Sequence, residues 1–210
     1  MERERITISI KKKLLDSIDK TIDGVNIRNR SHAIETLASA SLGISDAKNI
    51  VVLIGGRDAL KSIPAAEKTL SSLSEQGFSK VYIAVGFLAD KIKEKLGDGS
   101  EFGLKLQYVT EGEGSGGAIL PLKKHFDKTF IVINSRQEST VNLEKITDFH
   151  KYHNSVATVA TNNIEELEGI YVFEPEIFSY ISKGFSMLEG DIFPKLIEEN
   201  KLVVLPLKNN

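Results

Sequence analysis

The sequence predicts an α/β protein in which a small arm of one strand and two helices precedes a three-layer α/β/α domain. Polar and apolar residues alternate over Arg5–Ile10, and apolar residues then recur at helical spacing to about residue 38. From Asn49 onward, buried strands alternate with helices. Side chains repeat every two residues in a strand and every 3.6 in a helix, so these patterns separate the two kinds of element. The expected boundaries are 1–43 for the arm, 44–48 for a linker and 49–210 for the larger domain.

Composition indicates a globular protein with a proper core. The chain has 210 residues, of which 41% are hydrophobic, enough for one domain of moderate size and a small appendage. It contains no cysteine, which excludes disulfides, thiolate nucleophiles and thiolate metal sites. No apolar run approaches the ~20 residues of a membrane-spanning helix, and the charged start lacks the apolar core of a signal peptide. We therefore expect a cytoplasmic protein with no membrane partner.

Charge is distributed unevenly along the chain. The net charge is −2, yet residues 1–43 carry eight basic and six acidic side chains. Two paired arms would bring both modest positive patches onto one surface, where positive charge favours phosphate binding.

The alternating segment predicts an exposed strand that needs a partner. Its apolar face holds Ile6, Ile8 and Ile10, and its polar face holds Arg5, Thr7 and Ser9. A strand this short is unstable alone. Paired with its copy in a second chain, it would form a two-stranded ribbon narrow enough for the major groove of DNA.

Two helices are expected after this strand. A stripe of Leu14, Leu15, Ile18 and Ile22 marks the first helix, which Asp23-Gly24 ends. Asn29 is suited to cap the second helix over residues 30–38. One strand and two helices supply too little core for a monomer, which favours an intertwined dimer.

These features resemble the ribbon–helix–helix DNA-binding domain of Arc/Met-repressor-like proteins over about residues 3–43. The resemblance implies that strand side chains read bases and that amides at the start of the second helix hold a phosphate. It implies double-stranded DNA as a partner and a homodimer or higher oligomer. The alternative is an arm used only for dimerisation. The DNA-binding residues implied are Arg5, Thr7, Ser9, Asn29, Arg30 and Ser31.

The larger domain has the pattern of a parallel sheet. Ile50–Ile54 is a continuous apolar run ending in Gly55-Gly56, typical of a buried parallel strand that leads into a loop. Alternation of strands and helices places ligands at the carboxyl ends of the strands. Further strands are expected at 81–85, 105–109, 130–133 and 156–161, helices at 66–76, 89–96, from about 118 and at 143–153, and a glycine-rich turn at 112–117.

Several stretches resemble the sugar-phosphate nucleotidyltransferase family over about residues 49–205, above all Gly77–Ile119, with Gly169–Phe173 and Leu188–Pro194. The resemblance implies a Rossmann-like domain and a nucleotide or sugar-nucleotide ligand. One glycine loop would cradle phosphates, and a second would let the backbone come close to a base. The candidate nucleotide-binding residues are Gly55, Gly56, Gly114, Ser115, Gly116, Gly117 and Arg136.

The same resemblance predicts that catalysis has been lost. The family holds a divalent metal with an aspartate in a Gly-Asp pair after its fourth strand, where this chain has Ser135-Arg136. Arginine cannot coordinate a metal ion and would repel it. The family signature expected after Gly55-Gly56 is also missing. We therefore expect no catalytic residue, no bound metal and no cofactor.

Together these features predict a dimeric or larger, sequence-specific DNA-binding transcriptional regulator. Its inactive nucleotidyltransferase-like domain, a pseudoenzyme, would sense a ligand or arrange oligomers. Two alternatives stay open: an active sugar-phosphate nucleotidyltransferase, and a purely structural or antitoxin-type dimerisation protein.

Overall fold

A computed structural model describes residues 5–22, 29–41, 49–56, 59–86, 88–135 and 141–207. The chain divides into two compact units, residues 1–44 and residues 45–210, which we call the small unit and the large unit. Among the described residues, no helix combines the length and the apolar character needed to cross a membrane.

The small unit contains two packed helices, α1 (Lys12–Asp19) and α2 (Arg30–Ser41). The Asn29 side chain accepts a hydrogen bond from the His32 amide at 3.0 Å, so Asn29 caps α2 as predicted. The Arg30 guanidinium donates to both carboxylate oxygens of Asp19 at 2.7 Å each, which ties the second helix to the first.

The strand predicted over residues 5–10 is not found. Residues 5–11 carry no regular secondary structure, and Ile6 and Ile8 are 71% and 53% exposed. A strand is held by backbone hydrogen bonds to a second strand, and the described part of a single chain offers this segment no such partner. The two helices of the predicted arm are therefore present, while the ribbon is not shown.

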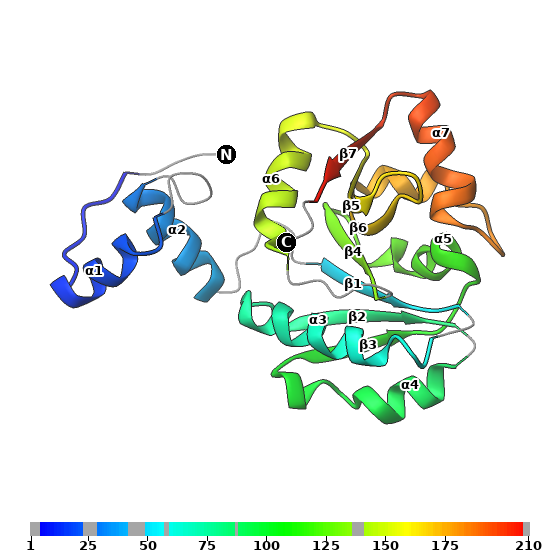
Figure 1. Ribbon diagram of the computed structural model, residues 1–210, viewed down its shortest axis with the longest axis horizontal. Helices are drawn as coiled ribbons and strands as arrows, with labels where there is room; N and C mark the ends of the chain where they lie inside the picture. Colours follow the sequence, from blue (N-terminus) through cyan, green and yellow to red (C-terminus); the bar gives the residue numbers. More distant parts are fainter. Residues whose placement is uncertain are drawn as a thin grey trace. The chain divides into compact units, whose positions relative to one another are not determined.

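The described residues of the large unit form a seven-stranded sheet in the order β3-β2-β1-β4-β6-β5-β7 (Figure 1). Neighbouring strands are parallel, except that β6 runs antiparallel to both β4 and β5. The bounds are β1 (Asn49–Ile54), β2 (Lys80–Val85), β3 (Lys105–Val109), β4 (Phe130–Asn134), β5 (Ala157–Asn163), β6 (Glu168–Phe173) and β7 (Leu202–Pro206).

The central strands read as continuous apolar runs because both faces of the sheet are covered. In β1, Ile50, Val52 and Ile54 point into one core and Val51 and Leu53 into the other. The register brings Val52 opposite Ile83 of β2 and Ile133 of β4. The side chains of Ile50–Ile54 are thus placed among apolar neighbours.

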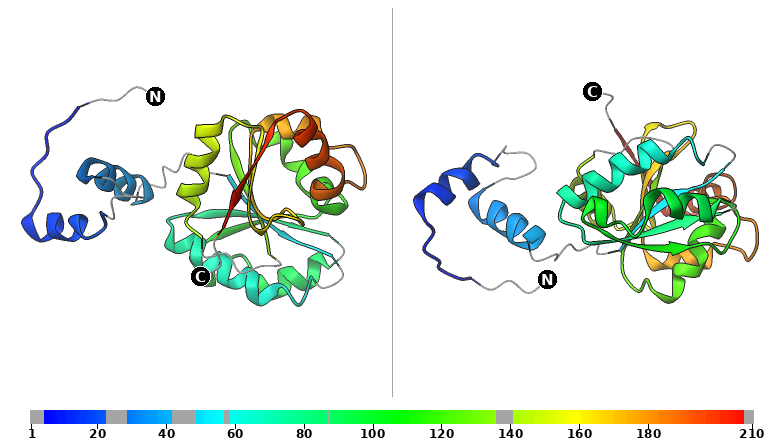
Figure 2. Two further views of the ribbon diagram at one scale, coloured as in Figure 1. Left: turned by 45° about the horizontal axis from the view of Figure 1, so that its top comes forward. Right: turned by 90° about the horizontal axis from the view of Figure 1, so that it is seen from below.

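Helices cover both faces and complete the predicted three layers (Figures 1 and 2). One face is covered by α3 (Ile63–Glu75), α4 (Ala89–Leu96) and α6 (Leu143–His153). The other is covered by α5 (Gly114–Ile119), the 3₁₀ helices η2 (Leu120–Lys124) and η3 (Pro175–Ser179), the π-helical turn η4 (Leu188–Ile192) and α7 (Phe193–Glu198). A further 3₁₀ helix, η1 (Ser100–Phe102), precedes β3.

The second of these cores is rich in aromatic rings. The ring of Phe130 in β4 lies 5.0 Å from that of Phe126 and 5.2 Å from that of Phe178, measured between centroids. Phe173 of β6 continues the cluster toward Phe193 of α7. Rings at these distances bury large apolar areas and so hold the helices of this face against the sheet.

Candidate functional site

Three neighbouring parallel strands of the large unit end in exposed glycines. Gly55 and Gly56 follow β1, Gly86 follows β2, and Gly112 lies shortly after β3. A Cβ atom added to Gly55 or Gly86 would meet no other atom within 4 Å. Backbone without side chains is therefore accessible at the carboxyl edge of the sheet, where α/β proteins bind ligands.

The second predicted glycine segment reaches the same edge. Residues 114–117 were expected in a turn, but they form the first residues of α5, which packs against β1 and β2. The structure thus brings Gly55 and Gly56 and the glycine segment to one side of the sheet.

Part of this glycine segment is packed against the chain itself. A Cβ on Gly114 would lie 2.3 Å from the carbonyl oxygen of Ser186, and one on Gly117 would lie 2.7 Å from that of Gly184. The amides of Gly116 and Gly117 donate to the same Ser186 oxygen at 2.9 and 3.1 Å. The sequence predicted that the backbone of this segment would come close to a nucleotide base. At Gly114, Gly116 and Gly117 it instead comes close to residues 184–187 of the same chain.

Ser115 belongs to a hydrogen-bonded group that sequence reasoning missed. Its hydroxyl donates to Oε2 of Glu189 at 2.7 Å, and the buried Tyr171 hydroxyl donates to Oε1 at 2.8 Å. Burial, and then the Glu189 carboxylate, raise the pKa of Tyr171 well above its ordinary value. Glu189 was not among the candidate site residues. The one signal that could have indicated Glu189 was that it lies in Leu188–Pro194, a stretch that resembles the family.

The residues that follow β4 bear on the predicted loss of catalysis. Ser135 is buried, its amide donates to the Leu53 carbonyl at 3.1 Å, and its hydroxyl donates to Ser62 Oγ at 3.4 Å. Arg136 lies outside the described residues. Within the described part of the chain, no three His, Cys, Asp or Glu side chains are grouped so as to hold a metal ion. Ser135, whose amide and hydroxyl are engaged by Leu53 and Ser62, does not fit the role of a metal ligand.

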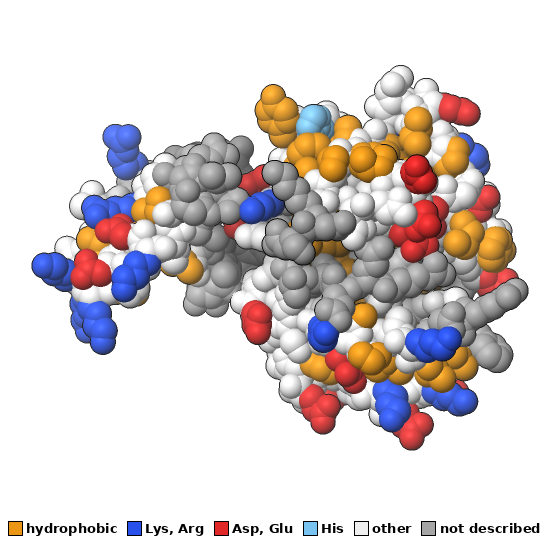
Figure 3. Space-filling model, viewed as in Figure 1, with side chains coloured by type: hydrophobic (Ala, Val, Ile, Leu, Met, Phe, Trp, Pro, Cys, Tyr) orange, Lys and Arg blue, Asp and Glu red, His pale blue; other side chains and the backbone are white. Residues whose placement is uncertain are grey.

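The predicted DNA-binding residues lie on the segment before α1 and at the start of α2. Arg5, Thr7 and Ser9 are exposed on the segment without a strand. Arg30 is engaged by Asp19, and its hydrogen bonds hold the pKa of that carboxyl below the ordinary value. Ser31 follows at the exposed start of α2. On the face drawn in Figure 3, acidic and basic side chains are intermixed over the small unit.

No family model matches the chain. It is 27% identical over 184 residues to a UTP–glucose-1-phosphate uridylyltransferase of Synechocystis sp., covering 64% of this chain and 47% of that protein. It is 26% identical over 171 residues to a mannose-1-phosphate guanylyltransferase of Mycobacterium tuberculosis, covering 65% and 48%. The chain thus spans about half the length of the curated relatives it matches.

A solved structure shows the same fold. HddC from Yersinia pseudotuberculosis, complexed with GMP-PN, superposes with a TM-score of 0.58 at 19% identity, over 75% of this chain and 90% of that chain. A UDP-glucose pyrophosphorylase complexed with UDP-glucose superposes with a TM-score of 0.57 at 14% identity, over 78% of this chain and 92% of that chain. With the sheet order and layers above, the large unit has the sugar-phosphate nucleotidyltransferase fold.

These comparisons contradict two predictions. The curated relatives are nucleotidyltransferases, so the prediction of a DNA-binding transcriptional regulator is wrong. The prediction of a non-catalytic pseudoenzyme is wrong for the same reason. It depended on the missing loop signature and on Ser135-Arg136 in place of Gly-Asp, whereas the match to a protein named as an enzyme covers 64% of this chain.

Proposed function

We propose that the large unit catalyses nucleotidyl transfer to a sugar 1-phosphate. The observation that carries the proposal is the 27% identity over 184 residues to a protein named UTP–glucose-1-phosphate uridylyltransferase. The fold alone would not suffice, because one fold serves many reactions. The exposed glycines at the carboxyl ends of β1 and β2 add support, since they leave room for a ligand where this architecture binds one.

In this proposal the nucleotide lies across the strand ends. Gly55 and Gly56 meet the phosphates with bare backbone, and the segment Gly114–Gly117 borders the nucleotide from the end of β3. Ser115 is the one residue of that segment with a polar side chain. Arg136 is included on sequence grounds, because it comes directly after Ser135 and carries the positive charge that phosphates attract.

The reaction is a displacement at phosphorus. A phosphate oxygen of the sugar 1-phosphate attacks the α-phosphorus of a nucleoside triphosphate. The bond from that phosphorus to the oxygen bridging to the β-phosphate breaks, and pyrophosphate leaves with the electron pair. Such transfers depend chiefly on positioning the two reactants in line and on stabilising the charge that develops on the phosphate oxygens.

The test uses the full chain with each of UTP and GTP, paired with glucose 1-phosphate or mannose 1-phosphate, in a buffer containing Mg²⁺. Pyrophosphate is measured by a coupled assay, and the nucleotide sugar is measured by chromatography. We expect one pair to give the two products in equal amounts. Triphosphate breakdown that does not depend on the sugar phosphate, or no product from any pair, would contradict the proposal. G55V, which adds a side chain in open space, should lower the rate without lowering the unfolding midpoint.

We further propose that the small unit joins two copies of the chain. Ile6 and Ile8 are exposed on a segment whose alternation suits a paired strand, and Leu14 and Leu37 are exposed on the adjoining helices. Each Å² of apolar surface removed from water stabilises a protein by about 25 cal/mol. Pairing two small units would bury these exposed side chains and gain that free energy.

Light scattering coupled to gel filtration tests this association. The wild type should have a mass at least twice the 23.2 kDa of one chain, and the double variant Ile6→Ser, Ile8→Ser should shift to the mass of one chain. Tyr152→Ser removes an 85% exposed aromatic residue of the large unit and should leave the mass unchanged. A wild type of 23.2 kDa would rule the association out.

A further inference from the structure

Residues 112–117, which comprise the end of a loop and the first turn of α5, are called the glycine turn from here on. The segment Gly184–Glu189 lies along this glycine turn, and backbone hydrogen bonds join them. Phe185 forms an isolated parallel bridge with Glu113, and the Ser186 amide donates to the Glu113 carbonyl at 3.0 Å. The Ser186 carbonyl accepts in return from two amides of the turn, as described above. The shape of the turn therefore depends on where residues 184–189 are held.

One carboxylate connects this contact to the sheet. Glu189 accepts from Ser115 of the turn through Oε2 and from Tyr171 of β6 through Oε1. The Ser115 hydroxyl also accepts from the Leu188 amide at 2.8 Å, so it is fixed from both sides. Hydrogen bonds to an ionised acceptor are stronger than those between neutral groups.

The fixed end of this connection is Tyr171. Its ring is fully buried, and its backbone lies opposite Val132 of β4 and Val159 of β5. The Gly169 amide lies 3.4 Å from its hydroxyl, which places that hydroxyl toward the end of β6 that adjoins the carboxyl ends of β4 and β5. Glu189 thus links the glycine turn to the interior of the sheet beside the proposed nucleotide site.

We propose that Glu189 is a positioning residue for the transfer reaction. It holds the turn Gly112–Gly117 in the conformation that meets the nucleotide, acting through Ser115 on one side and Tyr171 on the other. The inference rests on the proposed function for its role in the reaction, while the structural connection can be tested without any substrate.

Two readouts on the full chain test the proposal. The first is hydrogen exchange of the turn without substrate, and the second is KM and kcat for the nucleoside triphosphate. In Glu189→Ala, we expect the Gly116 and Gly117 amides to exchange at least about ten-fold faster. We expect KM to rise about ten-fold, equivalent to about 1.4 kcal/mol, with kcat within about two-fold of the wild type. A general loss of folded protein would instead lower kcat with the active fraction.

Two further variants separate positioning from misfolding. Glu189→Gln keeps the shape of the side chain and a carbonyl oxygen that can accept from Tyr171, but it presents its amide NH₂ toward Ser115. Its effects on exchange and KM should lie between those of the wild type and Glu189→Ala. Ser115→Ala should raise KM and exchange in the same way. Because the two residues act as one unit, the double variant of Ser115→Ala and Glu189→Ala should be no worse than Glu189→Ala alone.

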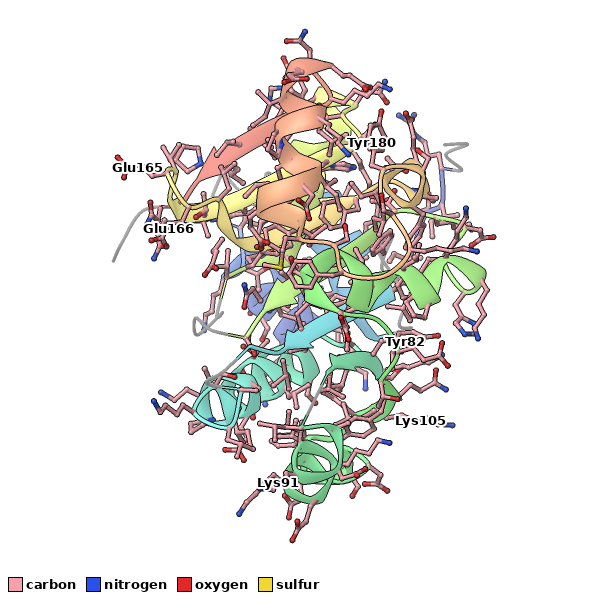
Figure 4. The ribbon with its side chains drawn as sticks, turned by 90° about the vertical axis from the view of Figure 1, so that its right-hand side faces the viewer. Tyr82, Lys91, Lys105, Glu165, Glu166 and Tyr180 are labelled. Atoms are coloured by element: carbon pink, nitrogen blue, oxygen red, sulfur yellow. The ribbon has the colours of Figure 1, made fainter. Side chains whose placement is uncertain are left out.

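Glu199 provides a matched control. Its Oε2 accepts from the Tyr180 hydroxyl at 2.6 Å and also pairs with the Lys201 ammonium at 3.0 Å. Tyr180 comes after β6, which runs away from the carboxyl edge. In Figure 4, Tyr180 lies on the other side of the large unit from Glu165 and Glu166, which follow β5 at the carboxyl edge. Glu199→Ala should change neither readout.

The outcomes are distinct. Unchanged exchange and unchanged KM in Glu189→Ala, or additive effects in the double variant, would overturn the proposal. If the wild type makes no nucleotide sugar, the proposed function fails and the reaction role of Glu189 fails with it. Exchange alone then decides whether Glu189 holds the turn.

Discussion

His150 in α6 is 1% exposed and bridges the helix to the sheet. Its Nδ1 lies 2.8 Å from the Thr158 hydroxyl of β5, and its Nε2 lies 3.1 Å from the Glu174 carboxylate. An ionised carboxylate can only accept, so Nε2 carries the proton and Nδ1 accepts from Thr158. Burial lowers the pKa of His150, an effect that Glu174 opposes only in part and to which the nearby Lys151 charge adds.

The stability of the large unit should therefore depend on pH through this side chain. Below about pH 6.5 the unfolded chain binds a proton at His150 that the folded chain does not, so stability falls as pH decreases from 6.5 to the lower folded pKa. Above pH 6.5 both states are neutral and this contribution is flat. Urea unfolding from pH 5 to 8 should show the slope in the wild type and a smaller slope in H150Q.

H153Q is the control for this prediction. It removes an exposed histidine from the same helix and leaves both hydrogen bonds of His150 in place. An identical pH dependence in H150Q and the wild type would show that His150 does not contribute.

The glycine turn yields a second prediction at the same scale. Gly114 has φ +77° and no room for a Cβ beside the Ser186 carbonyl, so G114A should destabilise the large unit by about 1–3 kcal/mol. G55A places its methyl group in open space and should change stability by less than about 0.5 kcal/mol. Thermal unfolding of both variants is the measurement, and equal midpoints would contradict the prediction.

At the scale of elements, the local pattern of apolar and capping residues predicted those strands and helices whose structure depends on residues close by in the sequence. The strands β1, β2 and β4 were predicted because burial on both faces produces apolar runs, whereas the edge strand β3 has only alternate residues buried. The helix over 143–153 was predicted with the same bounds, and Asn142 caps it by accepting from the Glu144 and Lys145 amides. These signals lie within a few residues of the element that they define.

The elements that were missed depend on distant residues. Glycine disfavours helix, so residues 114–117 were expected to form a turn, yet the contact with residues 184–187 holds them at the start of α5. The sheet places β6 between β4 and β5, an order that no local pattern encodes. For the site, Gly55 and Gly56 were noticed at the end of an apolar run, and Gly114–Gly117 came from the family resemblance. Glu189 was missed because Ser115 lies 74 residues away in the sequence.

The antiparallel strand β6 provides a prediction about packing. Phe173 is fully buried, with its ring centroid 5.7 Å from those of Phe130 and Tyr171. F173A leaves a cavity in the aromatic core and should lower the free energy of unfolding by about 3–5 kcal/mol. F185A makes the same change at a side chain that is 66% exposed and should cost less than about 0.5 kcal/mol. Urea denaturation would show whether the two differ.

At the scale of the whole molecule, the two units differ in the core they contain. The large unit has two extensive clusters of buried residues, one on each face of its sheet. Among the described residues of the small unit, the buried apolar side chains are Ile18 and Ala33. So little buried area cannot offset the entropy of ordering the chain, which is why we assign the small unit a second copy as its partner.

This difference predicts that residues 45–210 fold without the small unit, because both large cores are formed within them. The fragment should unfold in one cooperative step, at the midpoint of the main transition of the full chain. It should also have the mass of a single copy, since the small unit, which we propose joins two chains, has been removed. Calorimetry and light scattering on the same sample measure both properties. A fragment midpoint more than about 4 °C below that of the full chain corresponds to a loss of at least about 1 kcal/mol, and would show that the small unit stabilises the large one.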